Sequence, residues 1–219
     1  MKCVILYDTK AVEGLKTGWG FSCLVEHNMK KILFDTGGDG GILMHNMNAL
    51  GIKPEEINIL FLSHEHYDHV GGVGELLKHT ENEMIAFIPA SFSGSMKQLI
   101  SEHAKLVEVH GAKEIADGVY TTGELGSWLK EQSLVLKTNK GNVVITGCSH
   151  PGLDHIIDKA REFGEVYGVI GGFHGFNRLD KLKEIKFIVP VHCTQMKAEI
   201  LRMYPESAHE KIAGEWFEI

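Results

Sequence analysis

The sequence has few cysteines, and it has no long basic block and no long apolar run. Its four cysteines form no Cys-x-x-Cys pair, which argues against a disulfide framework and against a zinc knuckle. No block of five or more basic residues occurs and the net charge is −7, so we expect no nucleic-acid partner. No stretch approaches the roughly 18 apolar residues of a membrane span, and the apolar run at residues 1–8 is too short for a signal sequence. We therefore expect a cytoplasmic protein with no membrane partner.

The residues that are present have the composition of a globular protein, except for histidine. The chain has 219 residues, of which 43% are hydrophobic and 23% are charged, and this suits one folded domain over residues 1–219. Histidine occurs 13 times, a raised number for this length. Several histidines stand in loops that directly follow apolar, strand-like runs, and these are the candidates for chemistry. The sequence leaves the oligomeric state open.

Hydrophobic patterning predicts short strands in the first half of the chain and alternating strands and helices in the second. This order is typical of an α/β (α+β) fold in which two packed sheets carry helices on their outer faces. In such proteins ligand sites lie at the carboxyl ends of strands, where several of the histidines stand. The expected strands are 2–7, 21–27, 31–34, 58–62, 85–89, 106–109, 118–122, 133–138, 142–146, 166–170, 186–191 and 215–219. The expected helices are 42–50, a segment ending near residue 78, 95–103, 153–163 and 195–204.

Four potential metal ligands stand within six residues, directly after the buried strand expected at 58–62. Side chains two apart on extended backbone point the same way, so His64 and His66 can bind one ion together. Asp68 and His69 lie past a bend and can reach a second ion, which is the arrangement that two-metal hydrolysis needs. Imidazole and carboxylate groups suit zinc, iron(II) and manganese. The competing interpretation is an exposed polar loop.

The segment Ser-His-Glu-His-Tyr-Asp-His at residues 63–69 resembles the H-x-H-x-D-H signature of the metallo-β-lactamase superfamily. Residues 32–37, Ile-Leu-Phe-Asp-Thr-Gly, are similar to the earlier strand of that family, which ends in Asp-x-Gly. The resemblance implies that Asp35 supports the metal loop from behind, and that the fold is a four-layer αβ/βα sandwich with two divalent metal ions between the sheet edges. It also assigns His64 and His66 to the first metal, and Asp68 and His69 to the second.

The later ligands depart from the pattern of relatives such as glyoxalase II. Where those proteins carry a histidine in a T-P-G-H-T segment, this chain has Glu124, and where they carry a bridging aspartate it has Cys148. We expect His150, two residues further on, to supply the missing imidazole to the metal centre. Cys148 is either a thiolate ligand or a small packed residue. Glu124 is a ligand, an acid that hydrogen-bonds to a ligand, or a solvated turn residue.

Two further histidines follow buried strands near the C-terminus. His192 comes directly after the strand expected at 186–191 and matches the last histidine of the family, a second-metal ligand; the alternative is a hydrogen-bonded histidine at a strand end. His174 follows Gly171 and Gly172, and paired glycines let the backbone approach a ligand closely. We expect His174 to bind phosphate or to move a proton, with a structural or solvent-facing role as the alternative.

Three segments, Thr-Gly-Cys-Ser-His-Pro-Gly, Gly-Gly-Phe-His and Pro-Val-His-Cys-Thr, more narrowly resemble the 7,8-dihydropterin-6-yl-methyl-4-(β-D-ribofuranosyl)aminobenzene 5′-phosphate synthases. The expected function is a hydrolase or phosphate-ester-processing enzyme in which a metal-activated water, oriented by Asp68, attacks a small anionic substrate. One alternative is the synthase reaction, which joins a phosphorylated aminobenzene riboside to a pterin with loss of diphosphate. The other is a metal-dependent binding protein without turnover. Zinc is the expected metal, iron or manganese the alternatives, and the substrate is expected to be phosphorylated or pterin-like.

Overall fold

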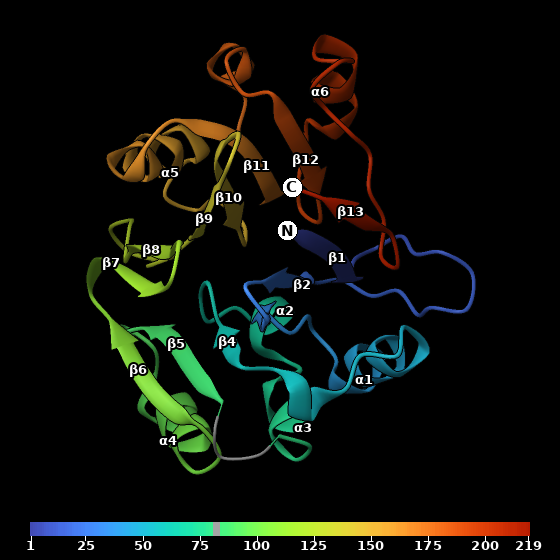
Figure 1. The fold of residues 1–219 in the computed structure, drawn as a ribbon, viewed down its shortest axis with the longest axis vertical. Coiled ribbons are helices and arrows are strands. Elements are labelled where there is room, and N and C mark those ends of the chain that lie inside the picture. The colour runs from blue at the N-terminus through green and yellow to red at the C-terminus, as the bar shows by residue number, and fades with distance from the viewer. Residues whose placement is uncertain (81–83) are drawn as a thin grey trace. The chain divides into compact units, whose positions relative to one another are not determined.

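The computed structural model describes residues 1–80 and 84–219, which fold into two compact units (Figure 1). Unit 1 comprises Met1–Val109 together with Ile212–Ile219, and unit 2 comprises His110–Lys211. Each unit contains one sheet with helices packed on it, so the chain has a mixed α/β fold. The single domain expected over residues 1–219 stays a prediction.

The sheet of unit 1 combines an antiparallel half and a parallel half. Its described strands follow the order β13-β1-β2-β3-β4-β5-β6, antiparallel from β13 to β3 and parallel from β3 to β6. The β2–β3 turn places Asn28 at φ +46° and Met29 at φ +60°, the left-handed pair that a type I′ hairpin requires. The strands are β1 (Lys2–Tyr7), β2 (Ser22–His27), β3 (Lys30–Phe34), β4 (Ile59–Phe61), β5 (Ile85–Pro89), β6 (Lys105–Val109) and β13 (Trp216–Glu218).

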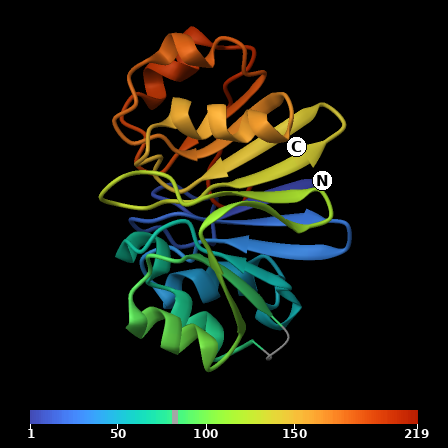
Figure 2. The same ribbon diagram turned by 90° about the vertical axis from the view of Figure 1, so that its left-hand side faces the viewer.

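Helices connect the parallel strands of unit 1 and cover one face of its sheet (Figure 2). Leu43 and Leu76 of two of these helices pack in one buried cluster with strand residues such as Leu60. The side chains of Asp39 and Ser93 each accept a hydrogen bond from a first-turn N–H, which fixes where α1 and α4 begin. The helices are α1 (Gly40–Ala49), the 3₁₀ turn η1 (Pro54–Glu56), α2 (Tyr67–Val70), α3 (Val73–Leu77) and α4 (Gly94–Ser101).

The sheet of unit 2 has a parallel half that carries most of its helices. The described strands follow the order β12-β11-β10-β9-β8-β7, parallel from β12 to β10 and antiparallel from β10 to β7. They are β7 (Gly111–Ala116), β8 (Val119–Gly123), β9 (Leu134–Thr138), β10 (Gly141–Thr146), β11 (Val166–Gly172) and β12 (Phe187–Val191). The helical elements are α5 (Leu153–Ala160), η2 (Arg161–Phe163), η3 (Leu179–Leu182) and α6 (Lys197–Met203).

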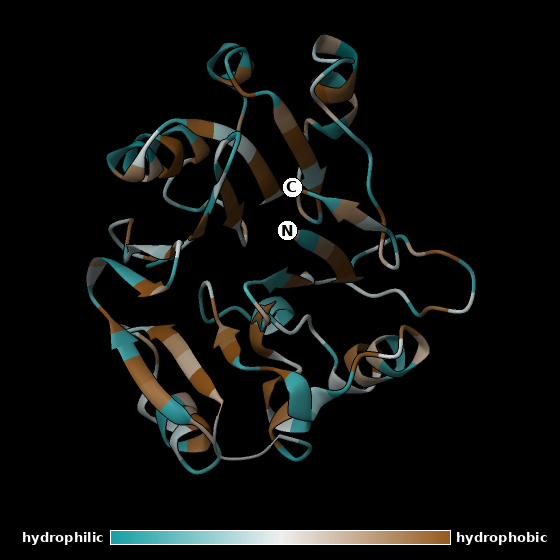
Figure 3. Ribbon diagram, viewed as in Figure 1, coloured by the Kyte–Doolittle hydropathy of each residue, from teal (hydrophilic) through white to brown (hydrophobic). Residues whose placement is uncertain are grey.

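Helix α5 packs its apolar side against the sheet of unit 2. Ile156, Ile157 and Ala160 lie in one buried cluster with Val144 and Val169 of the strands. Figure 3 shows this pattern, because β11 and β12 are hydrophobic along most of their length whereas α5 alternates between hydrophobic and hydrophilic residues. The polar residues described below lie outside this packed face, at the carboxyl ends of β10, β11 and β12.

Helix α2 and strand β7 have no counterpart among the elements expected from the sequence. Residues 67–70 form the short helix α2, in which the amides of His69 and Val70 both bond to the carbonyl of His66, at 2.9 and 3.1 Å. Strand β7 was not expected, because most of its side chains are exposed and show no alternation that would mark a strand.

No helix among the described residues is long and apolar enough to cross a bilayer.

Candidate metal centre

The first group of candidate ligands stands at the carboxyl ends of β3 and β4. These strands pair in parallel with Phe34 opposite Phe61, so the residues that follow them meet at one edge of the sheet. Asp35 directly follows β3, and its backbone N–H donates to the Phe61 carbonyl at 2.9 Å. Its φ of +51° is rare for a residue other than glycine, and such conformations cluster at functional sites.

The buried Asp35 carboxylate holds two histidines of the motif in place. Its Oδ1 accepts the Ser63 backbone N–H at 2.7 Å, and its Oδ2 accepts the Ser63 hydroxyl at 2.7 Å and lies 2.7 Å from Nδ1 of His69. Because the Ser63 hydroxyl gives its one proton to Asp35, it can only accept from Nδ1 of His64, 2.9 Å away. We therefore assign the proton to Nδ1 in both imidazoles, so that each presents Nε2 as an electron-pair donor.

The motif brings its four potential ligands together in two pairs. One ligand atom of His64 and one of His66 lie within 4.8 Å of each other, and so do one atom of Asp68 and one of His69. In the second pair, Nε2 of His69 lies 3.8 Å from Oδ2 of Asp68. Two ligands on one ion lie roughly 3–4 Å apart, since each is about 2 Å from the metal. Each pair is therefore close to the spacing at which one ion contacts both side chains.

Backbone hydrogen bonds hold α2 and its ligands against the rest of unit 1. The Phe21 N–H donates to the carbonyl of Asp68 at 3.1 Å, and the Thr36 N–H donates to the carbonyl of His69 at 2.8 Å. Gly20 must be glycine here, because its φ is +150° and a Cβ would lie 2.5 Å from the Asp68 carbonyl oxygen. The helical turn is thus fixed from outside the motif.

A second group of polar residues stands at the carboxyl ends of β10, β11 and β12. The register pairs Thr146 with Gly171, and Gly172 with Val191, so the three loops that follow begin at the same edge of the sheet. Non-glycine residues with positive φ stand in each of these loops. They are Ser149 at φ +59°, His174 at φ +44° and His192 at φ +49°. This concentration of strained backbone marks the edge as a candidate functional site of unit 2.

Glu131 shapes the loop that carries Cys148 and His150, and its sequence context does not reveal this role. This carboxylate is buried, and its Oε1 accepts the backbone N–H groups of Gly147, Cys148 and Ser149 at 3.1, 3.0 and 3.0 Å. Oε1 also accepts the hydroxyl of a neighbouring threonine, and Oε2 accepts the His150 N–H at 2.8 Å. One carboxylate thus satisfies consecutive amides that face the same way, which fixes the course of the loop.

The two cysteines of this edge face each other. Sγ of Cys193 lies 3.4 Å from Sγ of Cys148, and a ligand atom of Cys148 lies within 4.8 Å of one of His192. The pKa of the Cys193 thiol is lowered to about 5, first by a hydrogen bond from Cys148 to its thiolate, then by the charge of His192 and a hydrogen bond from His174, while burial opposes the shift. A thiolate is a good ligand for zinc, so Cys193 and Cys148 are both candidate sulfur donors at this edge.

The paired glycines at the end of β11 are required by close packing. A Cβ on Gly171 would lie 2.0 Å from the Thr146 carbonyl oxygen, and a Cβ on Gly172 would lie 2.4 Å from the Gly147 carbonyl oxygen and 2.7 Å from Sγ of Cys193. These glycines therefore allow β11 to run close to the β10 loop and leave room for the thiol, while the close approach of their backbone to a ligand stays a prediction.

The remaining predicted residues take separate positions in unit 2. The rings of His150 and His174 lie 5.2 Å apart, and His174 is exposed. Glu124 follows β8 and is half-buried, and its backbone N–H donates to the carbonyl of His110 at 3.2 Å. Among the described residues, Glu124 belongs to no group of three or more candidate ligands whose atoms lie within 4.8 Å of one another. Its role as a ligand stays a prediction.

The chemistry of these donors fits a divalent metal of the first transition row. Unit 1 offers imidazoles whose Nδ1 atoms are held by Asp35 and Ser63, which is the usual setting of a metal-ligating histidine. It also offers the Asp68 carboxylate, and unit 2 adds imidazole and thiol groups at one sheet edge. Zinc accepts all three kinds of ligand, and iron(II) and manganese accept the nitrogen and oxygen donors.

Comparison with known proteins gives a family match over most of the chain. The family model of the metallo-beta-lactamase superfamily matches residues 19–176. The 7,8-dihydropterin-6-methyl-4-(beta-D-ribofuranosyl)-aminobenzene-5′-phosphate synthase of Methanocaldococcus jannaschii is 28% identical over an alignment covering 85% of this chain and 83% of that protein. An uncharacterized protein of the same organism is also 28% identical, over 89% of this chain and 91% of its own length.

A solved structure gives a similar result. The crystal structure of Tm1679, a metal-dependent hydrolase of the beta-lactamase superfamily, matches with a TM-score of 0.82 and 26% sequence identity. The match covers 100% of this chain and 99% of that one. The superfamily resemblance read from residues 63–69 is thereby confirmed.

Proposed function

Because the chain belongs to the metallo-beta-lactamase superfamily, we propose that it is a metal-dependent enzyme that hydrolyses or otherwise processes a small anionic molecule, such as a phosphate ester. Members of the superfamily are generally enzymes. The observation that carries the proposal is the hydrogen-bonded set Asp35–Ser63–His64 and Asp35–His69. This set leaves Nε2 of both imidazoles as donors, and a buried carboxylate behind such histidines is the arrangement that metal sites use.

We further propose that both units contribute ligands to the same pair of ions. The support is the family pattern together with the geometry within each unit. In this assignment the first ion is held by His64, His66 and His150, and the second by Asp68, His69 and His192. The paired thiols of Cys148 and Cys193 favour a zinc-binding role for Cys148 over simple packing.

The metal ions, when bound, lower the pKa of a bound water to near neutrality, so that hydroxide is available as the nucleophile. The chain's own residues position the reactants. The Asp68 carboxylate lies 3.8 Å from Nε2 of His69, so it would help hold a metal there and would orient the nucleophilic water by accepting a hydrogen bond. His174 is exposed and lies beside His150, so it can donate a hydrogen bond to a substrate phosphate or a proton to a leaving oxygen.

Turnover by the metal-loaded chain tests this proposal. The protein would be loaded with zinc, manganese or iron(II), its metal content measured by mass spectrometry, and its activity assayed on a phosphodiester, a phosphomonoester, a thioester and a lactone. We expect turnover of at least one anionic ester, lost in His64→Ala and Asp68→Ala. A fully metal-loaded protein that turns over none of these substrates contradicts the hydrolase, and tight binding without turnover would favour a metal-dependent binding protein instead.

A second reaction is favoured by the similarity to the methanogen synthase. In this reaction the chain would join a phosphorylated aminobenzene riboside to a dihydropterin diphosphate ester and release diphosphate, and the same metals would assist departure of the diphosphate. Incubation with both substrates, followed by measurement of released diphosphate, separates the two functions. A hydrolase gives no diphosphate that depends on the riboside.

A cytoplasmic location is part of the proposal and stays a prediction.

A further inference from the structure

A cavity of about 340 Å³ lies beside His150 and His174, entirely within unit 2. Its size suits a small molecule, because ligand pockets span roughly 300–1,000 Å³. Asn177 and Arg178 contribute amide and guanidinium groups to its wall, and Phe176 contributes an aromatic ring. No aspartate or glutamate is among the described residues that line it, so its wall offers hydrogen-bond donors and the Arg178 cation without a carboxylate of its own.

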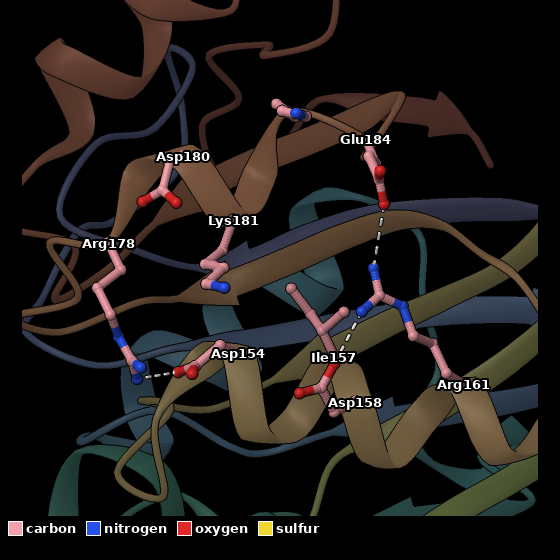
Figure 4. Close-up of a pocket in the computed structure, with 9 residues that line it drawn as sticks. Asp154, Ile157, Asp158, Arg161, Arg178, Asp180, Lys181 and Glu184 are labelled. Carbon is pink, nitrogen blue, oxygen red and sulfur yellow. Dashed lines mark hydrogen bonds and ion pairs between the residues drawn. The ribbon is translucent and has the colours of Figure 1, made fainter.

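Arg178 lines this cavity and also a second one, of about 370 Å³, between α5 and the segment at residues 178–184. Asp154 lines only the second cavity, where its Oδ1 accepts a hydrogen bond from Nη2 of Arg178 at 2.5 Å (Figure 4). The Asp154 carboxylate is nearly buried, with 11% of its side chain exposed. Arg178 is therefore anchored by Asp154 and also lines the cavity of His150 and His174.

The anchored guanidinium keeps the means to bind an anion. Arginine carries five N–H donors in a planar fork that matches phosphate, and the hydrogen bond to Asp154 uses one of them. The Arg178 side chain is 52% exposed, so a ligand can reach it without displacing packed atoms. Asp154 fixes the position of the fork, which reduces the ordering cost of binding.

We propose that this cavity is the phosphate subsite of the enzyme, in which Arg178 binds the phosphate of a small phosphomonoester and Phe176 contacts the apolar part of the same molecule. Asn177 donates an additional hydrogen bond from its amide group, and His174 lies on the side of the cavity nearest His150. This inference rests on the proposed function, since it names the class of substrate that the site receives. It commits to phosphate rather than carboxylate because a phosphate offers three oxygens to the donors gathered here.

Binding of phenyl phosphate to the full-length, metal-loaded chain tests the subsite without requiring turnover. We expect calorimetry to detect binding by the wild type, and Arg178→Ala to weaken it about 10- to 100-fold, the loss expected for a hydrogen-bonded ion pair. Arg178→Lys should retain only part of the affinity, because lysine lacks the fork. Asp154→Asn should also weaken binding, since the guanidinium loses its anchor.

Arg161→Ala is the matched control. Arg161 lines only the second cavity, where it pairs with Asp158 and Glu184, so its loss should change the affinity less than twofold (Figure 4). Equal affinities of wild type and Arg178→Ala, at equal metal content, would overturn the subsite even if the enzyme turns over other esters. Benzoate binding as tightly as phenyl phosphate would overturn the commitment to phosphate. Binding that follows the prediction in a protein without turnover would support the subsite and reject the enzymatic proposal alone.

Discussion

Two buried carboxylates, Asp35 and Glu131, act in the same way in the two units. Each stands outside the loop it serves and accepts several hydrogen bonds from it. A carboxylate can do this because it offers only acceptors, so donors can converge on it from several directions without conflict. Substitution by asparagine or glutamine therefore tests this role, because the amide replaces one acceptor oxygen with a donor nitrogen.

Asp35→Asn should weaken zinc binding by about 10- to 100-fold, as the loss of a carboxylate behind a metal-ligating histidine does elsewhere. At the Oδ1 position the Asn amide nitrogen would face the Ser63 backbone N–H, and at the Oδ2 position it would face both the Ser63 hydroxyl and the Nδ1–H of His69, all of them donors. His69 would then shift its proton to Nε2, the atom that a metal needs. Zinc affinity measured by competition with a chelator checks this. The control is Asp39→Asn, which removes the same charge at an α1 cap that asparagine serves equally well; equal losses in both variants would contradict the role of Asp35.

Glu131→Gln should lower the free energy of unfolding by about 2–3 kcal/mol, because the loop amides lose a charged acceptor and His150 N–H meets an amide donor. It should also reduce zinc content at temperatures where the variant is folded, since His150 is proposed as a ligand. Urea unfolding followed by circular dichroism, with zinc content by mass spectrometry, gives both readouts. Glu165→Gln, at an exposed glutamate of the same unit, should change stability by less than about 0.5 kcal/mol. Normal zinc content in folded Glu131→Gln would count against the loop's role.

The sequence predicts the residues near the motif better than those that support them from a distance. His64, His66, Asp68 and His69 stand together in the chain, and Asp35 is found through its Asp-x-Gly context. Glu131, by contrast, lies 16–19 residues before the amides it binds, and nothing in its neighbours marks it. Long-range hydrogen bonds of this kind leave no periodicity in a sequence, so only the structure can assign them. Asp154 and Arg178 illustrate the same point, since they pair across 24 residues.

At the scale of elements, strands in the core are predicted closely and exposed elements are not. The expected strands at 2–7 and 85–89 have the same bounds in β1 and β5, because each is a short, mostly apolar run. Strand β7 and helix α2 escape prediction, the first because it is mostly exposed and the second because it is too short to show a period of 3.6 residues. Helix α5 ends at Ala160 and continues as the 3₁₀ turn η2, where one helix over 153–163 was expected.

The β2–β3 hairpin supplies a prediction about stability at this scale. Met29 has φ +60° and is fully exposed, so its side chain gains nothing from packing while its Cβ strains the turn. Met29→Gly should raise the free energy of unfolding by about 0.5–1 kcal/mol, since Asn-Gly is a preferred type I′ pair. Thermal unfolding should shift upward by about 2–4 °C per kcal/mol. Met29→Ala keeps the Cβ and should give no gain; an equal gain from alanine would show that strain at this position is not the cause.

For the whole molecule, the mixed α/β fold class and the superfamily are confirmed, and the family model matches residues 19–176, which include parts of both units. Each unit has the same plan, an antiparallel half and a parallel half whose strand ends carry polar residues. Each also holds only part of the proposed ligand set. If His64, His66 and His150 hold one ion, as we propose, metal binding is a property of the entire chain, and not of either unit alone.

Metal removal should reveal this coupling. If both units supply ligands to the same ions, zinc at 100 times its dissociation constant should stabilise the chain by about 2.7 kcal/mol, which corresponds to an increase of roughly 5–10 °C in the unfolding temperature. Calorimetry should then show one transition with zinc. After chelation it should show a broader transition or two transitions, because no metal ion is then bound by both units. His150→Ala and His192→Ala remove ligands from unit 2 only, yet each should abolish most of the zinc-dependent shift. A shift of wild-type size in both variants would mean that unit 1 binds the metal by itself, and the shared centre would have to be abandoned.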